Sequence, residues 1–381
     1  MIEKKLLKNL DFILIINIFL ILGFSLLVIA SASQSAYSAN PYYYAKKQLV
    51  NIVLGLAAMF GMLTVNYIHL ATRQKWIYGL MLGLLLIVWI PGLGHNSKGA
   101  QSWINLGFML LQTSEVAKLL FIIAFAQFLG NREHDLNNFK DFLPTFLYVI
   151  PPMLLIAVQP DLGTALVFTG IYFGMMFIGS SNLRLLAGIG LSGLAAAIGG
   201  IWVHFNIVEW LPLKAHQIQR LIVFLDPYND GMGGKSFGFN LIQSKVAIGS
   251  GGLWGKGWGS GTQVQGNFLP EHHTDFIFAV VGEEFGFIGA AILLLLYLFL
   301  IYRLILIAYH AKDLFGTLIV IGIASMFMFH LLVNVGMTIG IMPITGIPLP
   351  LLSYGGSSML VNLASLGLAL NIGMRKQKIV F

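Results

Sequence analysis

Two acids and two histidines stand directly before a long apolar stretch, within residues 271–275. Asp275 is the last of them, and an acid at the mouth of a membrane helix is costly enough to need a reason. One interpretation is a helix cap or a first-turn acid that the helix dipole favours. The other is a general base, because a carboxylate between apolar walls binds a proton more tightly and can take one from a hydroxyl. The residues alone leave both interpretations open.

A second candidate is the pair formed by Glu115 and Lys118, which are three residues apart at the start of another apolar run. This spacing places both side chains on one face of a helix, where they can pair. Because a lone buried cation is costly, we predict that the pair forms. Its role is open: it either fixes helix packing or presents a lysine, held by its glutamate, to a phosphate.

Three further charged residues lie in segments of different character. Asp161 follows a proline in a tight turn, and the structural role is favoured there because Pro-Asp is ordinary turn chemistry. Arg220 and Lys245 fall in two stretches that we predict to be amphipathic helices at the membrane interface. Arginine binds phosphate with two parallel hydrogen bonds. Contact with lipid head groups explains both cations equally well.

The remaining ionisable residues are given no function. Adjacent histidines in the run 271–273 point in different directions on any regular element, so we predict no fixed metal there. His330 lies inside an apolar stretch, where a neutral packing histidine is the simpler interpretation. Glu283 and Glu284 lie about two turns after Asp275 in the predicted helix, and we expect at least one of them to face the interior of the bundle.

The composition places these residues in an integral membrane protein. The chain is 57% hydrophobic and only 10% charged, with a mean hydropathy of +0.83, whereas soluble domains are about 25% charged. Backbone groups in lipid must pair within the segment, so the spans are helices. There are no cysteines, which excludes disulfides and thiolate metal sites. The net charge of +7 suits anionic lipid rather than nucleic acid.

We predict an all-α membrane protein, a single polytopic domain over residues 1–381 with about ten transmembrane helices. Each span needs roughly 20 apolar residues to cross the hydrocarbon core. The predicted spans are 11–31, 48–66, 76–91, 115–130, 143–159, 163–180, 184–204, 276–301, 315–338 and 357–374.

Lysine and arginine in the short loops predict the orientation, because they concentrate on the cytoplasmic side. Both termini are then cytoplasmic, and residues 205–274 form a large loop outside the membrane between spans 7 and 8. Aromatic residues in this loop, such as Trp254 and Trp258, argue against disorder. The cations assigned to the inner side are Lys4, Lys5, Lys8, Arg73, Lys75, Arg132, Lys140, Arg184, Arg303, Lys312, Arg375, Lys376 and Lys378, against Lys46, Lys47 and Lys98 outside.

Five segments, in this order and spacing, resemble the SEDS proteins (shape, elongation, division and sporulation). They are QTSEVAK at 112–118, QPDLG at 159–163, RLIVFLDP at 220–227, LPEHHTDFIFA at 269–279 and PLLSYGGSS at 350–358. The ten-span layout also matches. The segments QSKVAIGSGG at 243–252 and GKGW at 255–258 resemble the elongation branch of the family. The chain departs from the common pattern at 231–235 and at Thr113, where proline is frequent.

The resemblance implies peptidoglycan glycosyltransfer at the outer face of the cytoplasmic membrane during cell elongation. The substrate would be lipid II, a disaccharide-peptide on undecaprenyl pyrophosphate, and the reaction would invert the anomeric centre with Asp275 as general base. Lys118, Arg220 and Lys245 would lie near the leaving pyrophosphate, where positive charge is needed.

The resemblance also assigns supporting residues and partners. Glu115 would hold Lys118, and Asp161 would position substrate or a divalent cation, magnesium or manganese, shared with the pyrophosphate. No tightly bound cofactor is implied. A class B penicillin-binding protein and other membrane proteins of the elongation complex would be partners. Two alternatives stay open: a lipid II flippase, and a non-catalytic scaffold of the elongation machinery.

Overall fold

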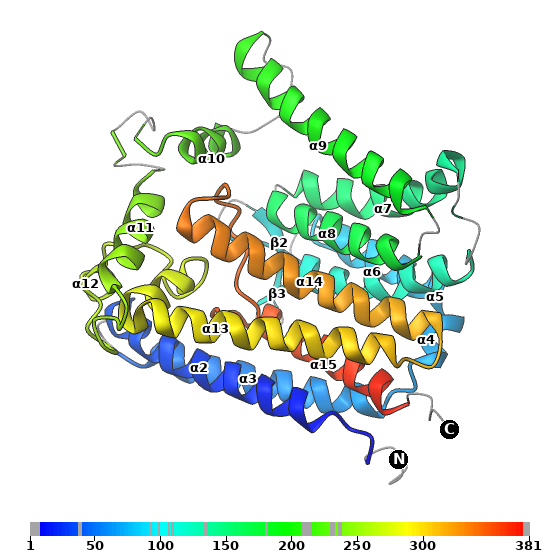
Figure 1. Cartoon of the computed structure of the whole chain (residues 1–381), viewed down its shortest axis with the longest axis horizontal. Coiled ribbons are helices and arrows are strands. Elements are labelled where there is room, and N and C mark those ends of the chain that lie inside the picture. The colour runs from blue at the N-terminus through cyan, green and yellow to red at the C-terminus, as the bar shows by residue number, and fades with distance from the viewer. Residues whose placement is uncertain are drawn as a thin grey trace.

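Long helices form a bundle in which both termini lie at one end (Figure 1). The structure is a computed structural model, and it describes residues 8–36, 40–90, 93–97, 100–105, 107, 110–132, 136, 138–159, 161–179, 182–207, 215–228, 233–234 and 238–375. Lys4, Lys5, Lys98, Lys376 and Lys378, which were used to predict the orientation, lie outside these residues.

The bundle consists of helices, with three short strands between α5 and α6. The elements are α2 (Phe12–Ala36), α3 (Tyr43–Thr64), α4 (Ile68–Thr72), α5 (Gln74–Ile87), β1 (Gly94–Ser97), β2 (Ala100–Asn105), β3 (Leu110–Gln112), α6 (Thr113–Gly130), α7 (Phe139–Val158), α8 (Leu162–Gly179), α9 (Leu183–Asn206), α10 (Ala215–Leu225), α11 (Phe239–Gly251), α12 (Thr262–Gln265), α13 (Ile277–Tyr309), α14 (Leu314–Ile339) and α15 (Gly356–Met374).

Every predicted span coincides with a helix, which confirms the all-α membrane class. Within the described residues, eight helices are long and apolar enough to cross a membrane: α2, α3, α6, α7, α9, α13, α14 and α15. The helices α5 and α8 are apolar but shorter. The number of ten crossings, and the side on which the long loop lies, stay predictions.

The largest error in a predicted boundary is at the end of α13. This helix was expected to end near residue 301 but continues to Tyr309. Arg303 does not interrupt it, because its guanidinium reaches the carboxylate of Asp11 at 2.6 Å. The residues that follow, 304–309, are apolar enough to extend the helix.

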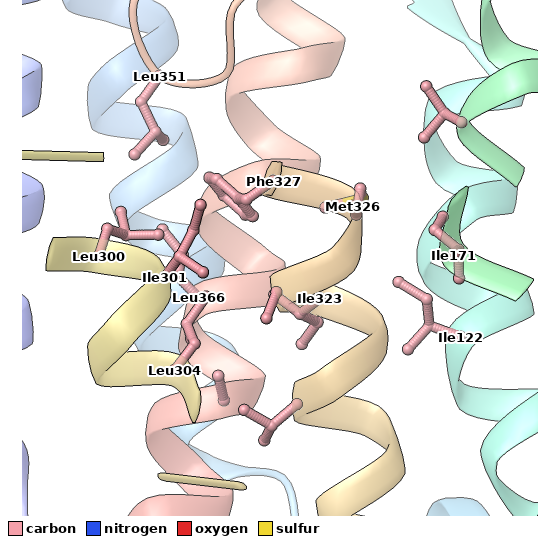
Figure 2. Close-up of a cluster of buried hydrophobic side chains, with 14 of the residues drawn as sticks. Ile122, Ile171, Leu300, Ile301, Leu304, Ile323, Met326, Phe327, Leu351 and Leu366 are labelled. Carbon is pink, nitrogen blue, oxygen red and sulfur yellow. The ribbon is translucent and has the colours of Figure 1, made fainter. Parts of the chain in front are cut away.

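The hydrophobic core lies where α13, α14 and α15 meet α6 and α8 (Figure 2). Figure 2 shows aliphatic side chains from all five helices pointing toward one another across α14. Both α14 and α15 are largely buried, so their polar residues can be satisfied only inside the protein. The labelled members of the cluster are Ile122, Ile171, Leu300, Ile301, Leu304, Ile323, Met326, Phe327, Leu351 and Leu366.

The three strands, which the sequence analysis did not predict, form a small antiparallel sheet in the order β1-β2-β3. Strand β3 runs directly into α6, and Gln112 is the residue before the first turn of that helix. The hydroxyl of Ser357 accepts from the N–H of Gln112 at 2.9 Å and donates to the carbonyl of Leu110 at 2.8 Å. The sheet is therefore attached to the start of α15, and it positions the start of α6.

A break in α13 was also not predicted. Gly286 has a φ of 65° and a ψ of −164°, values that a glycine adopts without steric strain. Such a break leaves carbonyls before it and N–H groups after it without helical partners. Residues 252–261, which we call the joint segment, supply those partners. The N–H groups of Lys256 and Gly257 donate to the carbonyls of Glu283 and Glu284, both at 3.0 Å, and those of Phe287 and Ile288 donate to the carbonyls of Gly252 (2.9 Å) and Leu253 (3.1 Å).

The predicted loop 205–274 contains α10, α11 and α12, gathered at the end of the bundle opposite the termini (Figure 1). Helix formation in the two predicted amphipathic stretches is confirmed. However, α11 packs against α13 and α14 and buries Leu241, Ser244, Ala247 and Gly251. Its apolar face is thus covered by protein, because residues 252–261 hold it against α13.

Candidate functional site

The segment between α14 and α15, residues 341–355, has no regular secondary structure and carries the motif PLLSYGG. We call it the connecting segment. Backbone carbonyls buried inside a protein need hydrogen-bond partners from the protein or from ordered water. Side chains from four helices supply them here: Tyr297 donates to Pro350, Ser25 to Leu352 (2.8 Å), Gln48 to Ser353 (3.3 Å) and Asn334 to Ile347 (2.8 Å). These bonds hold the segment in one conformation.

Asp275 lies two residues before the first residue of α13 and is partly exposed. Its position at a helix N-terminus is as predicted. The amide of Asn334 donates both to the carbonyl of Asp275, at 2.9 Å, and to that of Ile347, so one side chain ties the two segments together. Gly346 has a φ of +73°, and a Cβ there would lie 3.5 Å from Asp275 Oδ2. The carboxylate therefore lies against Gly346.

The predicted pair of Glu115 and Lys118 forms, with Lys118 Nζ 2.7 Å from Glu115 Oε1. Both side chains are buried in α6. The same ammonium is 2.9 Å from Nε2 of His330 on α14. An ammonium can only donate, so Nε2 must be the acceptor and the ring is a neutral imidazole with its proton on Nδ1.

His330 carries this contact on to the connecting segment, because its Nδ1–H donates to the carbonyl of Pro348 at 3.1 Å. The network thus runs from Glu115 through Lys118 and His330 to Pro348. Two places in it are not used by the described residues. Glu115 Oε2 is buried without a partner, and an ammonium has three N–H groups, of which two are engaged. This spare capacity suits a ligand or an ordered water.

Asp161 caps α8 and joins it to α6. Its Oδ2 accepts from Gln112 Nε2 (3.1 Å), Ser114 Oγ (3.2 Å) and Thr164 Oγ1 (2.8 Å), and its Oδ1 accepts from the N–H of Thr164 (3.0 Å). The first turn of α8 also touches the connecting segment, since a Cβ on Gly163 would lie 2.8 Å from the carbonyl oxygen of Thr345. These bonds favour the structural role of Asp161, and a contact of this residue with substrate stays a prediction.

Arg220 and Lys245 are both exposed and approach the same region from α10 and α11. Arg220 Nη1 is 3.5 Å from the carbonyl oxygen of Thr345. Lys245 lies over Gly340 at the C-terminus of α14, where a Cβ on Gly340 would be 2.6 Å from its Nζ. That position suits a cation, because the C-terminal end of a helix dipole is negative.

Most of the candidate residues therefore converge on a short stretch of the connecting segment. Arg220 reaches residue 345, Asp275 lies against 346, and the Lys118 network ends at 348. Four residues span at most roughly 14 Å even when fully extended. A carboxylate, a buried ammonium and an exposed guanidinium thus surround one patch of backbone. Lys245 lies outside this stretch, over Gly340 just before the connecting segment begins.

Sequence analysis missed two residues of this site, His330 as a partner of Lys118 and Asn334 as the clamp on Asp275. A signal was present. The two polar side chains are four residues apart in an apolar stretch, so they lie on one face of a helix that must bury them.

Glu283 and Glu284 are both buried, as expected for at least one of them, but they lie in α13 beside its break at Gly286 and are not part of this site. Glu283 accepts from Lys256 Nζ (2.8 Å), Thr262 Oγ1 (3.1 Å) and the N–H groups of Gln263 (2.9 Å) and Val264 (3.2 Å), which caps α12. Glu284 accepts from Ser31 Oγ on α2 at 2.5 Å.

In the part of the chain that the structure describes, no three His, Asp or Glu side chains gather as metal ligands. His272 lies with one ring nitrogen 2.6 Å from the carbonyl of Leu269 and the other 3.0 Å from that of Ala32. His273 stacks on Tyr44 with ring centroids 4.2 Å apart. Asp161 accepts three hydrogen bonds on Oδ2 and one on Oδ1, and its role with a divalent cation stays a prediction.

A model of the FtsW, RodA and SpoVE family, described as cell cycle proteins, matches residues 10–378. The chain belongs to this family. It is 37% identical over 98% of its length to stage V sporulation protein E of Bacillus subtilis, covering 98% of that protein. It is also 37% identical over 96% of its length to peptidoglycan glycosyltransferase MrdB of Escherichia coli K12, covering 93% of that protein.

Solved structures agree with this assignment. A chain from a peptidoglycan synthase complex that coordinates polymerization and crosslinking matches with a TM-score of 0.78 and 32% identity, over 96% of this chain and 97% of that one. The rod shape determining protein RodA of Thermus thermophilus matches with a TM-score of 0.70 and 30% identity, over 97% and 98%. The SEDS resemblance is confirmed. Because the sporulation protein and MrdB are equally similar, the elongation branch stays a prediction.

Proposed function

We propose that this protein polymerises lipid II into glycan strands during cell elongation, with Asp275 as general base. The observation that carries the proposal is the convergence of Asp275, the Lys118 network and Arg220 on residues 345–348. One side of this patch can accept a proton, and the other presents positive charge. The proposal is supported by the glycosyltransferase name of the relative MrdB.

The step that we propose is a single inverting displacement. The 4-hydroxyl of the acceptor sugar attacks the anomeric carbon of the donor while the Asp275 carboxylate takes its proton. The bond between that carbon and the pyrophosphate oxygen breaks, and undecaprenyl pyrophosphate leaves with the electron pair. Its developing charge is stabilised by Lys118, whose third N–H is available, and by Arg220 and Lys245 at the surface. Glu115 and the neutral His330 hold the ammonium in place.

The proposal involves no tightly bound cofactor. A divalent cation that accompanies the pyrophosphate would arrive with the substrate, and no step depends on it here. We also propose that the reaction takes place at the outer face of the cytoplasmic membrane, with both termini cytoplasmic and a class B penicillin-binding protein as partner. The similarity to a chain of a complex that couples polymerization to crosslinking supports the partner.

Strand formation from lipid II tests the function directly. We would compare the wild type with Asp275→Asn, each purified with its penicillin-binding partner, and use Asp141→Asn, an acid in the first turn of α7, as a matched control. A general base contributes about 10² to 10⁴ in rate. We therefore expect the Asp275 variant to make less than about 1% of the wild-type product while unfolding at the wild-type temperature.

Two results would contradict the proposal. Normal polymerisation by Asp275→Asn would remove this residue as the base. Failure of the wild type to make strands, with active partner and intact lipid II, would remove the polymerase function, and lipid II movement across vesicles would then decide between a transporter and a scaffold.

A further inference from the structure

A cavity of about 450 Å³ lies between the start of α2 and the end of α13, at the end of the bundle that carries both termini. It is far from the connecting segment in the fold, since α13 begins beside Asp275 and ends here. Its polar lining contains Lys8, Asn9, Asp11, Arg303 and His310. None of these residues has a part in the proposed reaction.

The charge of the lining is positive. Arg303 and Asp11 pair and offset each other, with Nε at 3.1 Å and Nη2 at 2.6 Å from Asp11 Oδ2. The other oxygen of Asp11 caps α2 by accepting from the N–H of Leu14 at 3.0 Å. Lys8 then adds an unbalanced charge, and the N-terminus of α2 adds the positive end of a helix dipole. The C-terminus of α13 opposes this field with the negative end of its own dipole.

The Arg303 guanidinium and the Lys8 ammonium point to an anion as the ligand. The Arg303 guanidinium uses Nε and Nη2 on Asp11, which leaves Nη1 for another acceptor. The ring of His310 donates Nδ1–H to the carbonyl of Leu306 at 2.8 Å, so Nε2 of the neutral imidazole is an acceptor and adds no donor for an anion. Arginine with a neighbouring lysine is the combination that recognises phosphate.

The rim of the cavity is apolar and exposed. Phe12 and Ile13 line the cavity and are 60% and 51% exposed. Tyr309, the last residue of α13, is 82% exposed, and aromatic residues with a polar tip favour the interface between head groups and acyl chains. A ligand that places a phosphate on the polar floor and hydrocarbon along the exposed faces of α2 and α13 matches both parts.

We propose that this cavity binds the head group of an anionic phospholipid, with Lys8 and Arg303 as the phosphate contacts. The neighbouring helices α2 and α13 pack against each other. A bound lipid therefore connects the start of α2 to the end of α13, the helix that begins two residues after Asp275.

Native mass spectrometry on the full chain tests the site. The protein, in mild detergent, is offered equal amounts of phosphatidylglycerol and phosphatidylcholine. We expect the wild type to retain phosphatidylglycerol preferentially. One cation near an anionic head group corresponds to a factor of about five in affinity, so Lys8→Gln should lower retention by about fivefold.

The control is Lys140→Gln, an exposed lysine in the first turn of α7 that does not line the cavity, and it should leave retention unchanged. Equal retention of the two lipids by the wild type would overturn the proposal. So would wild-type retention of phosphatidylglycerol by Lys8→Gln. Thermal unfolding with inorganic phosphate tests whether the ligand is free phosphate rather than a lipid. If inorganic phosphate raises the unfolding temperature as much as phosphatidylglycerol does, the site binds free phosphate and the lipid assignment is wrong.

Discussion

Two buried glutamates, each paired with a lysine, occupy opposite roles in this protein. Glu283 in α13 accepts four hydrogen bonds, three of them from the first turn of α12, and both of its oxygens are satisfied. Glu115 in α6 holds Lys118 with one oxygen, while its other oxygen is buried without a partner among the described residues. A carboxylate whose two oxygens both have partners suits a structural role, whereas one with an oxygen left over has room for a ligand.

The two lysines differ in the same way. The Lys256 side chain, which pairs with Glu283, is 25% exposed. Water can therefore solvate the Lys256 ammonium if the pair is broken. The Lys118 side chain is 1% exposed, and its neighbours are a carboxylate and a neutral imidazole. Removing one partner of a buried ion pair destabilises the folded protein by about 3–5 kcal/mol, because the other charge stays buried without a partner. The intact pair nevertheless adds little net stability. The comparison therefore contrasts a pair whose oxygens are all engaged with the buried pair to which we assign a role in the proposed reaction.

The largest effect is expected at Lys118. Loss of a charged group that stabilises a leaving group costs about 10² to 10³ in rate, so Lys118→Met should lower strand formation by at least about a hundredfold and weaken lipid II binding. The single variant leaves Glu115 buried without its partner. The double variant Glu115→Gln with Lys118→Met removes both charges and should recover stability but not activity, as measured by thermal unfolding beside polymerisation. Unchanged lipid II affinity would refute the role assigned to Lys118.

An intermediate effect is expected at Glu283, where a substitution should lower the stability of the protein rather than its polymerisation rate. Glu283→Gln weakens a charged acceptor of four hydrogen bonds, which we expect to cost about 2–3 kcal/mol. Denaturant unfolding in detergent measures this loss. The fraction that stays folded should polymerise at close to the wild-type rate. A loss of activity as large as that of Lys118→Met, without a loss of stability, would show that the two pairs have the same role.

The smallest effect sharpens the geometry of the site. Gly346→Ala places a methyl group 3.5 Å from Asp275 Oδ2 at a φ of +73°, where alanine costs about 1–2 kcal/mol. Gly107→Ala is the matched control, since Gly107 has a φ of +85° and a methyl group there would meet no atom of the described residues within 4 Å. Both variants should lose similar stability, but only Gly346→Ala should slow polymerisation. Equal rates in the two variants would place the reacting hydroxyl away from Gly346.

Local patterns were enough for the features that depend on neighbours in the chain. The apolar runs predicted helices at every proposed span, and the spacing of Glu115 and Lys118 predicted their contact. Asp161 was expected in a turn, where it caps α8. By contrast, the end of α13 was misplaced because the partner that allows Arg303 inside a helix, Asp11, lies 292 residues away.

The sequence by itself determined the membrane class, the helices and the local pairs, because hydrophobicity and helical spacing act over a few residues. Only the tertiary structure decided that His330, 212 residues from Lys118, accepts from its ammonium, and that Asn334 clamps Asp275 to the connecting segment. It also decided that Gly286 breaks α13 and that residues 252–261 fill the break. The physical reason is common to all three: a polar group buried in a membrane protein must find a partner, and packing alone determines which distant segment provides it.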